Sequence, residues 1–345
     1  MRENDGEESG DDEVQTADTM RERADESRLK LWLLIGANRL VVTVVLTASF
    51  FALFMLGALL EPTLSTMLLD RAVIEAMFSS MLTAIITAVT LVVTIGQLIV
   101  SQENGPLGEQ RQRMSATMDF RGYVTEIVGE PAPADPSAFL SRLVEAASER
   151  AQVLKATIDE HSDDQELRQE LSEFVDSLTG NADTVTEQIE GAKFGTFDVV
   201  HAAMDFNYGW KIFQIERLQD DYEDVLGAEE KDALEDLRRS LVLFGPAREH
   251  IKTLYFQWEL INLSRLILYV SVPALLVSGM MLTFVNGETV TGTTLGAENL
   301  LWVVAAAFSF TITPFFLLMS YVVRVTTLAK RTLAIGPLIL RDSQR

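Results

Sequence analysis

Four long uncharged stretches constrain this chain more than any other feature of its sequence. They run from Leu40 to Leu60, from Ala76 to Val100, from Leu266 to Val285 and from Leu300 to Val323. A helix needs about 20 predominantly apolar residues to cross the hydrocarbon of a bilayer. Because lipid cannot hydrogen-bond an open backbone, such stretches cross as helices. The sequence therefore predicts an all-α integral membrane protein with four transmembrane helices.

Lys and Arg near the ends of these stretches predict the orientation, because they concentrate on the cytoplasmic side. The basic flanks of the four stretches include Arg39, Arg111, Arg113, Arg265 and Arg324. The two loops on the opposite side, residues 61–75 and 286–299, contain only Arg71 between them. We therefore expect a multi-pass protein of the cell membrane, with both termini and the central segment cytoplasmic.

The predicted spans divide the chain into five parts in a 2+2 arrangement. These are an acidic, largely disordered tail (1–30), spans one and two (31–104), a cytosolic helical domain (105–264), spans three and four (265–324) and a basic C-terminal tail (325–345). The order of two spans, a helical block and two further spans resembles the topology of bestrophin-type anion channels. This resemblance implies a channel.

Heptad spacing within the central domain predicts an antiparallel helical hairpin, similar to a coiled coil. One apolar strip comprises Leu140, Leu143, Ala147, Ala151, Leu154 and Ile158, and a second comprises Leu167, Leu171, Phe174 and Leu178. Further helices are expected over 197–226 and 229–244. Proline is favoured in the first turn of a helix, so Pro246 predicts the start of a long helix that continues through span three. We expect no sheet in this domain.

Composition excludes several classes of function. The chain has 28 Lys+Arg against 50 Asp+Glu, a net charge of −22, which disfavours nucleic acid as a partner because phosphate contacts need basic residues. Only 7 of the 28 basic residues are Lys, and this acidic, Lys-poor composition is similar to that of halophilic proteins. Cys is absent and the three His are far apart in sequence. We expect no catalytic site, no cofactor and no metal, and therefore no enzyme.

Span two carries a stripe of polar side chains at spacings of three and four residues. We call Ser80, Thr83, Thr87, Thr90, Thr94, Gln97 and Ser101 the hydroxyl stripe. A period of 3.5 places all seven on one side of a helix. Small hydroxyl residues let membrane helices approach closely and bond across the contact. Alternatively, several copies of span two surround an axis and the stripe lines a water-filled path.

The sequence leaves two functions open. The first is a channel-like homo-oligomer in the lipid bilayer with span two as its lining. The second is a non-conducting scaffold or signalling subunit whose cytosolic domain binds a protein partner.

Overall fold

The structure, a computed structural model, is helical apart from one short hairpin. It describes residues 36–61, 70–190, 192, 197–286 and 289–331. The hairpin pairs β1 (Thr293–Thr294) with β2 (Ala297–Glu298) in antiparallel register. The all-α prediction is confirmed. The predicted disordered tail and the last fourteen residues of the basic tail lie outside the described residues.

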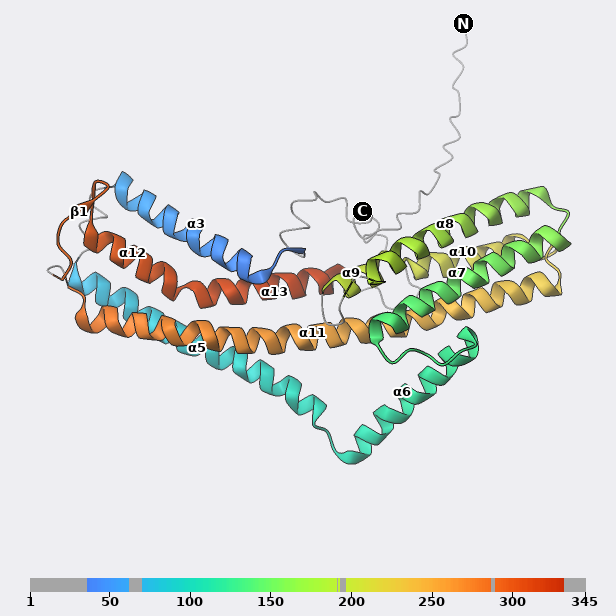
Figure 1. Ribbon diagram of the computed structural model, residues 1–345, viewed down its shortest axis with the longest axis horizontal. Helices are drawn as coiled ribbons and strands as arrows, with labels where there is room; N and C mark the ends of the chain where they lie inside the picture. Colours follow the sequence, from blue (N-terminus) through green and yellow to red (C-terminus); the bar gives the residue numbers. More distant parts are fainter. Residues whose placement is uncertain (1–35, 62–69, 191, 193–196, 287–288, 332–345) are drawn as a thin grey trace, which may run out of the picture.

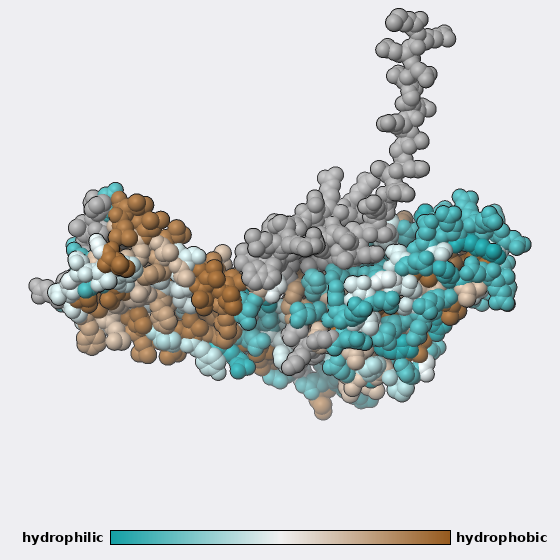
Figure 2. Space-filling model, turned by 45° about the horizontal axis from the view of Figure 1, so that its top comes forward, coloured by the Kyte–Doolittle hydropathy of each residue, from teal (hydrophilic) through white to brown (hydrophobic). Residues whose placement is uncertain are grey.

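Four helical segments are long and apolar enough to cross a membrane. They are α3 (Arg39–Leu60), α5 (Arg71–Glu103), the end of α11 (Ala228–Phe284), and α12 (Asn299–Thr311) continued by α13 (Thr313–Arg331). Together they form what we call the apolar bundle. Figure 2 shows apolar surface gathered over this end of the molecule and hydrophilic surface over the other. The fourth predicted span is thus two helices that meet at Ile312, two residues before Pro314.

The bundle is built by pairwise packing that leaves α5 at one edge (Figure 1). Helix α3 packs against α12 and α13 through aromatic contacts, including Phe50 with Phe308 at a centroid separation of 5.8 Å. Helix α5 packs along α11, where Val92 contacts Leu263 and Ile267 in one buried cluster. Because only one side of α5 is covered in this way, its opposite side is left open.

The other end of the molecule, which we call the polar lobe, holds the remaining helices. These are α6 (Leu107–Val128), α7 (Pro136–His161), α8 (Gln165–Glu190), α9 (Phe197–Asp205), α10 (Tyr208–Asp221) and residues 228–258 of α11. A single large core of buried aliphatic and aromatic side chains joins them. The first residues of α3 and the last of α13 lie at the end of the bundle nearest this lobe (Figure 1).

Helices α7 and α8 form the antiparallel hairpin that the heptad spacing predicts. The Asp135 side chain caps the start of α7 by accepting hydrogen bonds from the backbone amides of Ser137 and Ala138, at 3.0 and 2.9 Å. At the turn, Asp164 caps α8 in the same way through the amide of Glu166 at 2.9 Å. An oxygen that accepts from these amides satisfies donors that have no partner within the helix. Local capping and a shared apolar face therefore define this hairpin.

Two predicted boundaries in the lobe are wrong. The expected helix over 197–226 is broken at 206–207, where a buried polar network joins α8, α9 and α10: Asn181 donates to the Asp205 carbonyl at 2.9 Å and accepts from Lys211 at 3.0 Å. Pro246 lies inside α11 instead of starting it. A Cβ on the preceding Gly245 would lie 3.1 Å from the Tyr208 ring. Proline cannot donate a backbone hydrogen bond within the helix. The packing of α10 against α11 at Gly245 offsets the loss of that bond.

Helix α5 ends in a sharp elbow that directs α6 away from the bundle (Figure 1). The residue before a proline disfavours helical geometry, and α5 accordingly stops at its C-cap, Asn104, before Gly105 and Pro106. At about 1.5 Å per residue, the 33 residues of α5 are about 50 Å long. This exceeds the roughly 30 Å of bilayer hydrocarbon, so α5 is long enough to cross at a tilt or to extend beyond the hydrocarbon at one end.

Candidate functional site

The hydroxyl stripe lies on the open side of α5. All seven of its members are exposed in the protomer, whereas Phe78, Ile85 and Val92, at heptad spacing on the other side, are buried. No described helix of the same chain covers the stripe. The structure therefore brings the seven residues together on one surface, and that surface is available to lipid, water or a second copy.

The four threonines of the stripe are bonded to their own helix. Each hydroxyl donates to the carbonyl four residues earlier, as in Thr87 to Thr83 at 2.9 Å and Thr94 to Thr90 at 2.8 Å. This bond satisfies the donor and leaves oxygen lone pairs on the helix surface. Between Ala76 and Val100, the exposed surface of α5 is uncharged and able to accept hydrogen bonds from water.

A second site lies where the bundle meets the lobe, and we call it the charge junction. It contains Arg39 and Arg324, 4 and 7 % exposed, with Tyr255 and Glu259. These side chains come from α3, α13 and α11, so a single cluster ties three helices together. Arginines at span ends normally extend to water, and this burial requires polar partners within the protein.

The two guanidinium groups converge on one carbonyl oxygen. Arg39 donates to the Ala37 carbonyl from Nε at 3.0 Å and from Nη2 at 2.7 Å, and Arg324 donates to it from Nη2 at 2.6 Å. Arg39 also donates to the Ser320 carbonyl at 3.2 Å. The residues that precede α3 are thereby fixed against α13.

A carboxylate and two aromatic side chains complete the charge junction. Arg324 Nη1 lies 3.8 Å from Glu259 Oε2 and donates to the Tyr255 hydroxyl at 3.5 Å. Its guanidinium also lies 5.5 Å from the centroid of the Phe197 ring, at the start of α9. Since α9 belongs to the lobe and α13 to the bundle, these contacts join the two parts of the molecule.

Comparison with known families adds one observation: the family of unknown function DUF7972 matches residues 5–345. The chain belongs to DUF7972. No curated protein and no solved structure matches it. Membership of DUF7972 assigns no activity, so the function of this chain has to be argued from its residues.

Sequence reasoning identified the hydroxyl stripe of this DUF7972 chain but missed the charge junction. Arg39 and Arg324 were assigned only as basic flanks, which explains their position but not their burial. Glu259 is the sequence signal that could have indicated the charge junction. It is the last acidic residue before span three and lies one helical turn from Tyr255. Within the part of the chain that the structure describes, no group of three His, Asp or Glu side chains could hold a metal ion.

Proposed function

We propose that this DUF7972 protein is a channel-like homo-oligomer in which copies of α5 surround a water-filled path. The observation that carries the proposal is the exposure of the whole hydroxyl stripe on the side of α5 that no described helix covers. Lipid offers no hydrogen bonds to seven polar side chains, whereas water or a second α5 does. The path is neutral, since none of the seven side chains is charged.

In this proposal the polar lobe and both ends of the chain are cytoplasmic. The positive flanks favour that orientation, and the ends of α3 and α13 that lie nearest the lobe support it (Figure 1). The charge junction then lies at the inner surface of the membrane. It is placed to couple movements of the lobe to the bundle that carries α5.

Ion flux through purified protein in liposomes at molar KCl tests the proposal. The double variant Thr87→Leu/Thr90→Leu replaces two polar surfaces with apolar ones, and we expect it to reduce flux at least tenfold. Thr283→Leu is the matched control, because Thr283 is also exposed and also donates to the carbonyl four residues earlier, at 2.8 Å, but lies on α11. Equal flux in the parent and the double variant would contradict the assignment of α5 as the lining.

The second candidate is a non-conducting scaffold or signalling subunit whose lobe binds a cytosolic protein. The observation that favours it is the strongly acidic surface of α8, which carries seven acidic residues and one Arg. It requires that the folded protein supports no flux and co-purifies with a soluble protein. Flux in the parent that Thr87→Leu/Thr90→Leu abolishes would reject this candidate.

A further inference from the structure

Helix α6 is packed within its own chain at only one end. Near its C-terminus Val124 is fully buried, Phe120 lies 6.1 Å from the Phe139 ring, and Arg121 donates to the Pro133 carbonyl at 2.8 Å. All of residues 107–119, by contrast, are exposed. A helix of this length has little stability in water without tertiary contacts, so its first half needs a partner.

The exposed half of α6 has an ordered face of its own. Leu107, Arg111, Met114 and Met118 are spaced by four, three and four residues, which places them on one side of the helix. Leu107 is 82 % exposed, Met114 63 % and Met118 53 %. Arg111 is exposed too, and no described side chain forms an ion pair with it. We call these four residues the α6 face.

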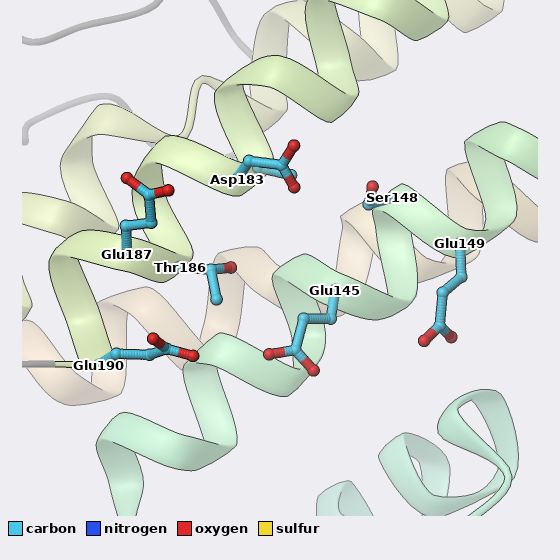
Figure 3. Close-up of a pocket in the computed structure, with 8 residues that line it drawn as sticks. Glu145, Ser148, Glu149, Asp183, Thr186, Glu187 and Glu190 are labelled. Carbon is cyan, nitrogen blue, oxygen red and sulfur yellow. The ribbon is translucent and has the colours of Figure 1, made fainter.

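An acidic pocket on the same lobe complements the α6 face. It has a volume of about 350 Å³ and lies between α7 and α8, and its carboxylates belong to Glu145, Glu149, Asp183, Glu187 and Glu190. In Figure 3 the carboxylates of Glu145 and Glu190 point toward one another across it. Arg142 pairs with Glu149 at 3.0 Å and with Glu145 at 3.6 Å, but no described side chain forms an ion pair with Asp183, Glu187 or Glu190.

Charge identifies a second copy as a partner that can approach α6. A chain of net charge −22 repels its copies over most of its surface. Helix α6 has three acidic and three basic residues, so its net charge is zero, and α5 beside it is uncharged between Ala76 and Val100. Another copy can therefore approach along α5 and α6 without this repulsion, and its pocket supplies the carboxylates that Arg111 lacks.

The geometry allows this contact between neighbours in a membrane. Helix α6 and the α7–α8 hairpin, which carries the pocket, overlap along the long axis of the molecule (Figure 1). A bilayer holds copies side by side in one orientation, which allows the α6 face of one copy to lie against the α7–α8 surface of the next. Because the two surfaces differ, repetition of the contact generates a ring when the rotation closes.

We infer that the α6 face of one copy docks on the α7–α8 surface of a neighbouring copy, with Arg111 entering the acidic pocket and Met114 and Met118 covered. This inference rests on the homo-oligomer of the proposed function and adds the contact that assembles it. In this contact, α6 is the element that sets the spacing between copies of α5.

Cysteine cross-linking tests the contact directly, since the chain contains no Cys. Full-length Met118→Cys and Thr186→Cys proteins are mixed, reconstituted together and oxidised. We expect a disulfide between the two variants, because Thr186 lines the pocket. Val225→Cys, which is 47 % exposed in the α10–α11 connection, replaces Thr186→Cys as the control and should not cross-link. Cross-linking of Met118→Cys only to itself, or not at all, would overturn the inference.

Charge reversal provides an independent readout. Arg111→Glu places a sixth carboxylate against the five of the pocket, and we expect it to raise the dissociation constant of the oligomer about tenfold. Arg111→Lys keeps the positive charge and should keep the parent constant, measured by light scattering in detergent. An Arg111→Glu variant that assembles as tightly as the parent would overturn the inference.

The oligomeric mass of the parent protein in lipid nanodiscs distinguishes failure of the α6 contact from failure of the homo-oligomer itself. An oligomer without the 118–186 disulfide contradicts only the docking of α6. A parent that is monomeric in lipid nanodiscs contradicts the homo-oligomer as well. Capture of a soluble protein on the α6 face in place of a second copy would also overturn the inference.

Discussion

The Arg324 side chain links several parts of the charge junction. It donates to the Ala37 carbonyl, pairs with Glu259 and lies over the Phe197 ring. Its removal leaves the Glu259 carboxylate, whose side chain is only 12 % exposed, without its ion-pair partner. Breaking a buried ion pair typically costs about 3–5 kcal/mol. We expect Arg324→Met to lower the free energy of unfolding by that amount, measured by thermal unfolding in detergent.

A double variant that also removes Glu259 shows whether the loss of stability in Arg324→Met comes from an unpaired charge or from lost packing. Replacing a whole buried ion pair with apolar residues is often neutral. Arg324→Met/Glu259→Met should therefore be more stable than Arg324→Met alone. If the double variant is the less stable of the two, the carboxylate is not the source of the destabilisation, and this description of the junction is wrong.

At Gly96, helix α5 lies close to α11. A Cβ at this position would lie 2.7 Å from Ser264 Oγ, which is held by a hydrogen bond to the Leu260 carbonyl at 2.9 Å. Overpacking of this kind costs about 1–3 kcal/mol. We expect Gly96→Ala to lower the thermal unfolding temperature of the protein in detergent, and Ser264→Gly to recover part of the loss.

Gly57 on α3 supplies the matched control. No atom lies within 4 Å of a Cβ built there, and alanine is about 0.5–1 kcal/mol better than glycine within a helix. Gly57→Ala should therefore leave the unfolding temperature unchanged or raise it. Equal losses in the two alanine variants would show that the contact with Ser264 is not responsible.

At the scale of elements, the tip of the α7–α8 hairpin is tied to the start of α11 through His161. Its Nδ1–H donates to the Thr157 carbonyl at 2.9 Å, and its Nε2 lies 3.2 Å from Glu229 Oε2. The hydrogen bond to Thr157, and then the charge of Glu229, raise the pKa of His161 above its ordinary value. The imidazolium form therefore favours the folded hairpin.

The sign of the pH dependence follows from this shift. A group whose pKa is raised by folding contributes stability that is fully present below its unfolded pKa, about 6.5 for His. That contribution is lost as the pH rises through the folded pKa. An NMR titration of the three His should show His161 titrating above its ordinary value, and Glu229→Gln should lower its pKa. A pKa unaffected by Glu229→Gln would contradict the contact.

The sequence predicts those elements whose signal is local. Apolar length identified the four candidate spans, and heptad spacing from Leu140 to Leu178 identified the hairpin, because each depends on residues within one or two helices. The boundaries at 206–207 and at Pro246 could not be predicted. Both depend on contacts between helices distant in sequence, the Asn181–Lys211 hydrogen bond and the packing of Tyr208 on Gly245.

At the scale of the whole molecule, the sequence predicts the polar stripe but not what surrounds it. Its period places seven residues on one side of α5, and no local rule indicates that α11 covers the other side. Nor does any pattern indicate the burial of Arg39, which depends on the carbonyl of Ala37, just before α3, and on that of Ser320 in α13. The sequence shows that these arginines lie at the ends of the spans. Whether their side chains extend to water or are buried depends on how the helices pack together.

A hydroxyl stripe that faces water within an oligomer is accessible to water-soluble reagents, and cysteine labelling along α5 measures that accessibility. Single Cys residues are introduced in the Cys-free chain at Thr83, Thr87, Thr90 and Thr94, and at Ile86, Leu91 and Leu98, which are exposed on α5 outside the stripe. Each reconstituted variant is treated with a membrane-impermeant thiol reagent while flux is recorded. Reaction and loss of flux at the four stripe positions alone are the predicted result. Equal reactivity in both sets, or reaction only outside the stripe, would contradict it.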